Sequence, residues 1–540
     1  MKKMYGIMID ISRGQIPKLK TLTNLIKFVK NSKINFLSLY IEHTFKYKKH
    51  PIIWKKNGAI SPDDIKKLTE FAKKYNIEII PSIQTLGHFE KILTHKEYAH
   101  LAESKFYSSL AISKKETYFL IEDLISEIAK TFNSDYINIG EDEVWDFAQG
   151  KSKIYVKKNG GEKKLFLQHI LKVREIAKKY NKKIMMWADM FFKYPEIIKK
   201  LPDDIIILNW DYNNASVKYF KEKIKALTKN DNLQIICTAT STWDSLFPQI
   251  KIYQNNILNF HKAALSFKEK IYGEMLTIWG DDGNFNFLGE SYPAISLFKE
   301  IHNIFNLNKL KHNEILSHSV QTIFEIKNKK ISDIFLFFSE LHKHLNLENS
   351  YELFKLYWSD PFFKNIILSK NFNIKYIKSL IKKSQDYLNI ITKYAPLKNR
   401  LIWDEIVYKI ILNNSLLRRI EISYYMYQIF EEIYNNLWNE KLVIQNIIKI
   451  LNYLNYLKRD LKYLRAKYRK IWLKSYKKEG LLYNLRKFDR LINEINEKCR
   501  KFKIALKKYK KEGVGIIELD NSFQRVINAI NGIFPDFFSF

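Results

Sequence analysis

Residues 134–147 read SDYINIGEDEVWDF and join a short apolar run to an acidic end. The run at 135–140 has the length of a buried strand, and apolar residues with helical spacing precede it over 116–132. Gly140 allows a bend at the end of the run, and three acidic residues follow it. A helix followed by a strand that ends in a polar turn is the repeating unit of a parallel α/β fold.

The same unit recurs along the first 306 residues. Further apolar runs lie at 4–10, 34–41, 77–83, 183–188, 205–210, 233–239 and 272–278. Helical spacing lies between the runs at 18–31, 61–75, 162–180, 214–229, 251–269 and 292–306, and the connection at 190–202 is short. Eight strands that alternate with helices predict an α/β fold of the (β/α)8 TIM barrel type. A doubly wound open sheet is the alternative.

The pattern changes after residue 306, because only four of the 16 glycines lie beyond it. Apolar residues with helical spacing fill long runs at 374–394, 401–435, 440–476 and 481–511. We therefore expect two domains, a catalytic barrel over 1–306 and an all-α C-terminal domain over 307–540. Two roles stay open for the helical domain, namely covering the barrel or mediating a homodimer.

Composition limits the class of protein. The formal net charge is +34, but the lysines are spread along the whole chain, which favours a solvated basic surface over a nucleic-acid footprint. The chain has two cysteines, Cys237 and Cys499, with no metal-type spacing and no disulfide framework. No apolar stretch approaches the length of a membrane span, and no signal-peptide cleavage site follows the N-terminus. We expect a cytoplasmic protein with no specific nucleic acid, no membrane partner, no metal and no cofactor.

Polar and aromatic residues gather at the ends of the predicted strands, where the active site of a parallel barrel lies. The strand ends carry Asp10, Arg13, Glu42, His43, Gln84, His88, Glu141, Asp142, Glu143, Trp187, Asp189, Trp210, Asp211, Tyr212, Trp243, Asp244, Trp279, Asp281 and Asp282. Four of the ten tryptophans are among them. Because aromatic faces stack on sugar rings and carboxylates bind hydroxyls, this set predicts a sugar-binding pocket.

Asp142 and Glu143 are the candidate catalytic pair, since glycosidic cleavage usually needs two carboxyl groups. Adjacent side chains on a strand point to opposite faces, but both can reach one pocket where the chain turns after Gly140. Two neighbouring acids resist ionising together, so we expect one of them to hold its proton near neutral pH.

These residues together resemble glycoside hydrolase family 20, the β-N-acetylhexosaminidases, and most of all its branch with a helical C-terminal domain. The segment NIGEDEV is similar to the Gly-x-Asp-Glu signature of the family. The further matching segments are GIMIDISR, IIPSIQTLGHFEKIL, MMWADMF, ILNWDYN, TSTWDSLFP and LTIWGDDGNF. The resemblance covers roughly residues 4–300 and is weak beyond them.

The resemblance implies hydrolysis of a terminal, non-reducing N-acetylglucosamine or N-acetylgalactosamine with retention of configuration. The implied partner is an oligosaccharide or glycoconjugate that ends in an N-acetylated amino sugar. The acetamido oxygen of the substrate would attack the anomeric carbon and form an oxazolinium ion. Glu143 would then be the general acid and base, and Asp142 would hold the acetamido N–H.

The resemblance also implies a set of binding residues. Trp187, Trp210 and Trp279 would form the walls of the pocket for the sugar ring and its acetamide. Arg13 and Asp281 would hold hydroxyls. The remaining expected binding residues are Tyr212, as the donor to the acetamido oxygen, His88, as a support for the acid pair, and Trp243.

Two positions depart from the family pattern, since Asn138 stands where many members have histidine and His43 stands where relatives of this branch tend to carry an acid. The alternatives are a sugar-binding barrel that has lost catalysis, a barrel glycosidase that uses both acids covalently, and a basic binder of nucleic acid or of anionic surfaces.

Overall fold

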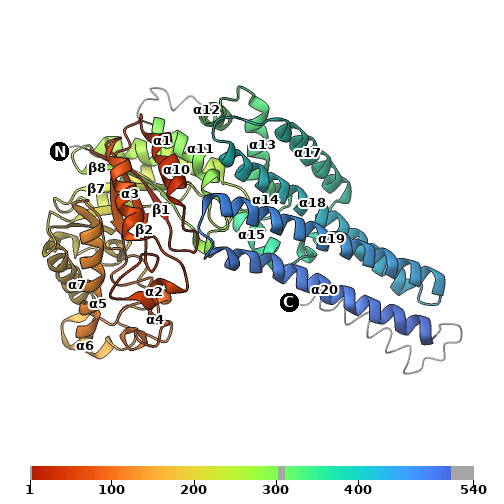
Figure 1. Cartoon of the computed structure of the whole chain (residues 1–540), viewed down its shortest axis with the longest axis horizontal. Coiled ribbons are helices and arrows are strands. Elements are labelled where there is room, and N and C mark those ends of the chain that lie inside the picture. The colour runs from red at the N-terminus through yellow and green to blue at the C-terminus, as the bar shows by residue number, and fades with distance from the viewer. Residues whose placement is uncertain (1–2, 302–310, 513–540) are drawn as a thin grey trace.

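The computed structural model describes residues 3–301 and 311–512 and contains a closed barrel of eight parallel strands. The barrel confirms the predicted fold class and rules out the open sheet. Figure 1 shows it at one end of the molecule. The strands are β1 (Met4–Asp10), β2 (Phe36–Tyr40), β3 (Glu78–Ser82), β4 (Tyr136–Asn138), β5 (Lys183–Trp187), β6 (Ile206–Trp210), β7 (Gln234–Ala239) and β8 (Ile271–Ile278).

Helices follow the strands and form the outer layer of the barrel. They are α1 (Leu19–Val29), α3 (Pro62–Lys73), α5 (Lys115–Thr131), α7 (Gly161–Lys178), α9 (Val217–Ala226), α10 (Ile250–Ala264) and α11 (Tyr292–Glu300). After β5 there is only a short α8 (Asp189–Lys193). Local chemistry fixes where α3 begins, because the Ser61 hydroxyl accepts a hydrogen bond from the Asp64 backbone N–H and the Asp64 carboxylate accepts one from the Ser61 N–H.

Three short helices in the loops were not predicted. They are α2 (Pro51–Lys55), α4 (Glu90–Leu93) and α6 (Lys153–Lys158). Each has six residues or fewer, which is less than two helical turns, so no apolar period can develop in the sequence. All three lie in loops that follow strands β2, β3 and β4.

The strands are buried on both faces, as parallel barrel strands are. All eight residues of β8 are buried. One apolar cluster fills the inside of the barrel, and a second lies between the strands and the outer helices. The inner cluster consists of Met4, Met8, Phe36, Tyr40, Ile80, Met185, Trp187, Ile206, Leu208, Ile235, Cys237, Tyr272 and Met275.

The rest of the described chain is helical, as predicted. Its helices are α12 (His312–Phe324), α13 (Lys329–Ser339), α14 (Leu341–His344), α15 (Ser350–Ser359), α16 (Lys364–Ile367), α17 (Ile374–Lys393), α18 (Arg400–Asn435), α19 (Glu440–Ser475) and α20 (Leu481–Glu512). The predicted boundary between residues 306 and 307 lies outside the described residues. Among the described helices, none is long and apolar enough to cross a membrane.

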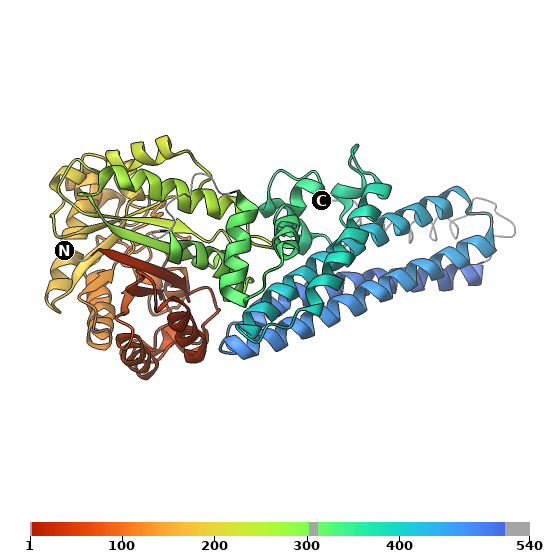
Figure 2. The same ribbon diagram turned by 90° about the horizontal axis from the view of Figure 1, so that it is seen from above.

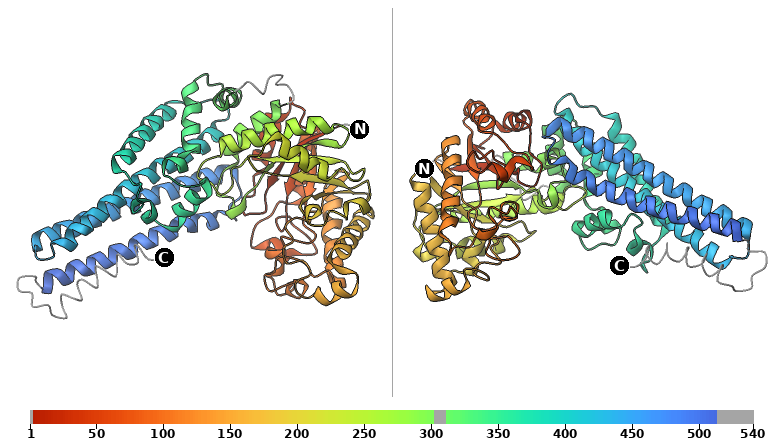
Figure 3. Two further views of the ribbon diagram at one scale, coloured as in Figure 1. Left: turned by 180° about the vertical axis from the view of Figure 1, so that it is seen from behind. Right: turned by 60° about the horizontal axis from the view of Figure 1, so that its bottom comes forward.

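The long helices α18, α19 and α20 run side by side away from the barrel, as Figures 2 and 3 show. Helix α19 carries a buried stripe with alternating steps of four and three residues, which is the spacing of helices that pack along their length. The stripe consists of Val443, Ile447, Ile450, Leu454, Leu457, Leu461, Leu464 and Tyr468. This apolar repeat explains why the second half of the chain folds as a bundle.

The bundle is joined to the loop after β8 by buried polar contacts. The Glu405 carboxylate on α18 accepts hydrogen bonds from the Gly289 N–H at 2.8 Å and from the Ser475 hydroxyl at 2.6 Å. The Lys409 ammonium lies 3.6 Å from the Glu290 carboxylate, and both side chains are fully buried. Burial raises the pKa of Glu405 to about 8 and lowers the pKa of Lys409 to about 8. The junction is therefore a desolvated cluster of ionisable groups.

Replacing Lys409 with alanine is expected to destabilise this junction strongly. The change removes the cation that faces Glu290 and leaves a carboxyl group buried without a charged partner. Breaking a buried pair in this way costs about 3–5 kcal/mol. Unfolding by denaturant measures the effect. As a control, Lys398→Ala breaks an exposed ion pair with Glu325 and should change stability little. Equal unfolding midpoints for the two variants would contradict this interpretation of the junction.

Candidate active site

The turn after β4 aims two neighbouring acids in one direction. Gly140, Glu141 and Glu143 all have positive φ, at 80°, 75° and 51°. Glycine suits position 140, because a φ of 80° strains other residues and a Cβ there would also press on the Gln84 side-chain amide. The Asn138 side-chain oxygen accepts a hydrogen bond from the Gly140 N–H at 3.1 Å and supports the turn. Strained backbone of this kind persists only where the surroundings enforce it, and it is concentrated at functional sites.

Two of the strand-end acids turn away from the centre of the barrel mouth. Glu141 is fully buried and its carboxylate contacts His169 on α7 at 3.2 Å. Asp211 pairs with Lys223 on α9 at 2.6 Å. These contacts join strand ends to outer helices, so both acids support the barrel.

The ten residues predicted for the site line one cavity of about 170 Å³. They are Arg13, His88, Asp142, Glu143, Trp187, Trp210, Tyr212, Trp243, Trp279 and Asp281. They come from the carboxyl ends of seven of the eight strands. The individual role of each residue remains a prediction.

Asp142 is buried and held by two partners. Its carboxylate accepts a hydrogen bond from the Gln84 amide at 2.8 Å and lies 3.4 Å from the His88 Nε2. Burial opposes charge on both groups, but their mutual attraction prevails. The pKa of Asp142 is lowered, and the pKa of His88 is raised to about 10. Asp142 is therefore a fixed carboxylate beside a histidinium at neutral pH.

Glu143 reaches further into solvent, with 60% of its side chain exposed. Its carboxylate lies 3.7 Å from His88 Nε2. Its backbone N–H donates to the Asp189 carboxylate at 2.8 Å. The two neighbouring acids thus differ in surroundings, since Asp142 is enclosed and Glu143 faces the open side of the cavity.

Asp189 also belongs to the site. It stands at the end of the fifth predicted strand, but the predicted catalytic and binding residues did not include it. It accepts hydrogen bonds from the Glu143 N–H and from the Trp210 indole N–H at 3.2 Å. Burial, together with the charge of Asp142, raises the pKa of Asp189 to about 7. This carboxyl group connects the turn of Glu143 to the aromatic wall.

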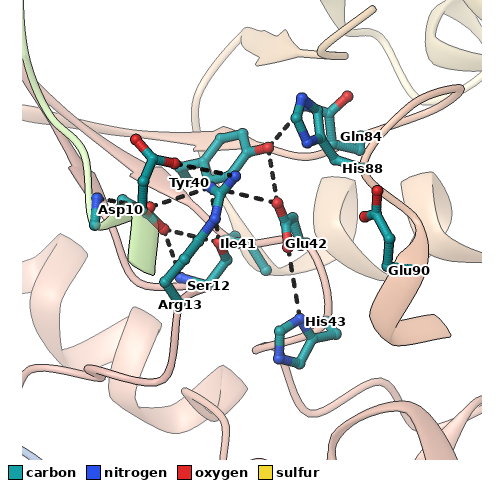
Figure 4. A network of polar contacts seen from close by, with 12 residues as sticks. Asp10, Ser12, Arg13, Tyr40, Ile41, Glu42, His43, Gln84, His88 and Glu90 are labelled. Carbon is teal, nitrogen blue, oxygen red and sulfur yellow. Dashed lines mark hydrogen bonds and ion pairs between the residues drawn. The ribbon is translucent and has the colours of Figure 1, made fainter. Parts of the chain in front are cut away.

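Arg13 is enclosed by three carboxylates and two rings. Its guanidinium lies 3.1 Å from Asp10, 3.4 Å from Glu42 and 3.7 Å from Asp281. It also lies over the Tyr40 ring at 5.1 Å. Figure 4 shows it between Asp10 and Glu42. Although burial opposes ionisation of Glu42, the Arg13 charge lowers its pKa to about 2.

Tyr40 connects this network to the acid pair and was not predicted. Its hydroxyl donates to Glu42 at 2.9 Å and accepts from the Gln84 amide at 2.8 Å. Since Gln84 also donates to Asp142, one chain of hydrogen bonds runs from Glu42 to the turn after β4. Tyr40 lies within an apolar strand, where a tyrosine gives no polar signal in the sequence.

Aromatic rings form the remaining walls. The Trp187 and Trp279 rings lie 5.7 Å apart, and Tyr212 lies 5.1 Å from Trp210 and 5.6 Å from Trp243. The Tyr212 hydroxyl accepts from the Trp279 indole N–H at 2.8 Å and also contacts the side chain of Thr277. The walls therefore combine flat apolar faces with a tyrosine hydroxyl.

The helical region supports the last wall. The Tyr483 ring of α20 covers Gly283, where a Cβ would lie 1.9 Å from the ring. The Asn484 amide donates to the Gly283 carbonyl at 2.8 Å. Gly283 lies two residues after Asp281, so the bundle holds the loop that carries this cavity residue. Burial raises the pKa of Asp281 to about 6, and the charge of Arg13 opposes this rise.

This constellation can bind a sugar and can protonate a leaving oxygen. The sequence agrees with the geometry, because residues 4–281, slightly more than half of the chain, match the model of the glycosyl hydrolase family 20 catalytic domain. The chain belongs to glycosyl hydrolase family 20. The matched residues span the barrel up to the start of the loop after β8.

Named relatives are similar to about half of this family 20 chain. It is 26% identical over 298 residues to hexosaminidase D of Bos taurus. This alignment covers 52% of this chain and 86% of the bovine protein. It is 26% identical over 307 residues to hexosaminidase D of Homo sapiens. This alignment covers 54% of this chain and 63% of the human protein. The chain thus spans less than two thirds of the human relative.

A solved structure of β-N-acetylhexosaminidase from Bacteroides fragilis NCTC 9343 is also similar. The TM-score is 0.46 at 19% sequence identity. The match covers 55% of this chain and 65% of that one.

Proposed function

We propose that this family 20 chain is an exo-acting β-N-acetylhexosaminidase. The observation that carries the proposal is the pairing of a buried, histidine-held Asp142 carboxylate with an exposed Glu143 in one aromatic-walled cavity. The cavity of about 170 Å³ lies well below the roughly 300–1,000 Å³ of pockets for larger ligands, so it suits one terminal sugar.

In the proposed first step, the substrate supplies its own nucleophile. The acetamido oxygen attacks the anomeric carbon, the glycosidic bond breaks, and the departing oxygen takes a proton from Glu143. Asp142 accepts a hydrogen bond from the acetamido N–H, which aligns the acetamide and stabilises the positive charge that develops on it. Such intramolecular attack gains from proximity, by about 7–11 kcal/mol in well-oriented cases.

In the second step, Glu143 takes a proton from water, and the water oxygen attacks the same anomeric carbon. The oxazolinium ring opens, the acetamide is restored, and the configuration is retained. Glu143 therefore serves as acid and then as base, a role that suits its open position. Asp142 keeps its charge throughout, which its lowered pKa supports.

The walls of the cavity bind the terminal sugar. Trp187 and Trp279 flank the acetamide and the ring, and the Tyr212 hydroxyl donates to the acetamido oxygen. Arg13 and Asp281 hold ring hydroxyls, with Arg13 fixed by Asp10 and Glu42. These roles require that one face of the sugar contacts aromatic rings while its hydroxyls face charged groups.

The proposal is tested with the 4-nitrophenyl β-glycosides of N-acetylglucosamine and N-acetylgalactosamine. The purified chain is expected to release 4-nitrophenol from at least one of them, and a thiazoline analogue of the oxazolinium ion is expected to inhibit. A sugar-binding protein without catalysis would show no release. Release without thiazoline inhibition would indicate a covalent glycosidase instead.

The pH dependence of kcat/KM should report Asp281. If Asp281 accepts hydrogen bonds from sugar hydroxyls, it must be ionised. Because its raised pKa is about 6, the acidic limb of kcat/KM should lie near this value, with kcat/KM falling as the pH falls through it. The profile of Asp281→Asn should lack this component of the acidic limb. An acidic limb that is unmoved in this variant would contradict the assigned role.

A further inference from the structure

Three exposed aromatic side chains gather outside the cavity. Phe106 and Trp145 are 56% and 57% exposed, and Tyr107 is 36% exposed. The Phe106 and Trp145 rings pack edge to face with centroids 5.0 Å apart. We call these three residues the rim platform. Large aromatic side chains are mostly buried, and a cluster of exposed ones marks an interaction site.

Backbone hydrogen bonds connect the rim platform to the segments that carry Glu143 and His88. Trp145 lies two residues after Glu143, and its backbone N–H donates to the Glu143 carbonyl at 2.8 Å. Phe89, which follows the cavity residue His88, donates its N–H to the carbonyl of Ser108 at 2.9 Å. Ser108 in turn follows Tyr107. The platform therefore adjoins the side of the cavity on which Glu143 stands.

A buried acid holds the rim platform in place. Asp146, next to Trp145, is 2% exposed and accepts hydrogen bonds from the Ser104 hydroxyl at 2.6 Å and from the Ser109 hydroxyl. These two serines flank Phe106 and Tyr107 in the sequence. One buried carboxylate thus ties the two platform loops together. A surface ordered in this way before binding loses less entropy when a ligand contacts it.

A surface cleft of about 780 Å³ lies beside the platform. It is lined by Ala99, Glu103, Ser104, Lys105, Phe106, Tyr107, Trp145, Asp146, Gln149, Gly150 and Lys151. The cleft is several times larger than the catalytic cavity and combines aromatic faces with polar side chains at its edge. This combination fits sugar rings, which offer C–H faces for stacking and hydroxyls for hydrogen bonds.

We propose that the rim platform binds the leaving part of the glycan, so that the enzyme acts on oligosaccharides of three or more sugar units. This inference rests on the proposed function. Glu143 protonates the departing oxygen, so the released chain must extend outward on its side of the cavity. Trp145 and Phe106 lie on that side. The first released sugar contacts the rim of the cavity, and the sugars beyond it stack on the platform.

The test compares kcat/KM for the β-1,4-linked trimer of N-acetylglucosamine with kcat/KM for 4-nitrophenyl N-acetyl-β-glucosaminide. The ratio of the two values isolates the contribution of the distal sugars to kcat/KM. Trp145→Ala and Phe106→Ala should each lower this ratio about three- to tenfold, which is the effect of losing one aromatic contact. Phe119→Ala is the matched control, since Phe119 is 66% exposed on the outer helix α5, and it should leave the ratio unchanged.

Each other outcome overturns the inference. The ratio could be unaffected by both platform substitutions, or the unaltered chain could cleave the trimer no better than the dimer. Trp145→Ala could instead change the mass in sedimentation while the ratio holds, which would assign the platform to contact with a second copy. If the unaltered chain cleaves none of these glycosides, the proposed function fails and the inference fails with it.

Discussion

Glu143→Gln is expected to lower kcat by about 10²- to 10⁴-fold on substrates with poor leaving groups, because it removes the proton donor. Amide and carboxyl groups have nearly the same shape, so binding of the terminal sugar should persist. The loss should shrink as the leaving group improves, since 4-nitrophenolate departs with less need of a proton than an alkyl or sugar oxygen. Steady-state kinetics over a series of aryl glycosides with rising leaving-group pKa measures this dependence.

A matched control for this variant is Glu97→Gln, an exposed acid in the loop after β3. It changes the charge of the same face of the barrel without touching the cavity, and its kinetics should equal those of the unaltered chain. A Glu143→Gln enzyme whose rate loss is the same for good and poor leaving groups would show that Glu143 does not donate the proton.

Asp142→Asn is expected to lower kcat by about 10²- to 10³-fold, the size of effect seen when one group that stabilises developing charge is removed. The side-chain amide of this variant would still face the Gln84 amide, but it could not stabilise the positive acetamide with a full charge. Affinity for the thiazoline inhibitor, which carries the geometry of the intermediate, should fall with kcat.

The same substitution has a second, independent readout at His88. The Asp142 carboxylate outweighs burial and raises the His88 pKa to about 10, so removing the charge should return that pKa toward or below its ordinary value. Titration of the imidazole signals by NMR measures the change. If kcat and inhibitor affinity fell but the pKa of His88 stayed near 10, the pairing of these two residues would be wrong.

The barrel and its strand ends could be predicted from sequence because a periodic signal marks them. A short apolar run marks each strand in the sequence, and the closed topology then gathers all the strand ends at one mouth. Residues as distant as Arg13 and Asp281 were therefore placed in one site without any knowledge of contacts.

Other features of the site depend on three-dimensional detail. The shared direction of Asp142 and Glu143 comes from positive φ at Gly140, Glu141 and Glu143, which non-glycine residues rarely adopt and which no local pattern indicates. The Glu42 and Tyr40 contacts form between strands β1, β2 and β3, so they appear only when the strands are paired.

The rim platform shows most clearly which features cannot be predicted from the sequence. Phe106 and Trp145 lie in loops that have no apolar period, and in the sequence each resembles an ordinary core aromatic residue. Their exposure and mutual contact depend on how Asp146 holds the loop at Ser104, which is a tertiary hydrogen bond. Exposure, rather than residue type, is what distinguishes a binding surface from a core here.

Fluorination of the substrate acetamide tests the central claim most directly. In the series of 4-nitrophenyl β-glucosaminides with acetyl, difluoroacetyl and trifluoroacetyl groups on nitrogen, fluorine withdraws electrons from the carbonyl oxygen that is proposed to attack. The account predicts that kcat/KM falls steeply along the series, by about tenfold or more overall, which corresponds to about 1.4 kcal/mol or more of activation free energy. Equal kcat/KM values across the series would contradict it, because a nucleophile supplied by the protein would be indifferent to the acetamide.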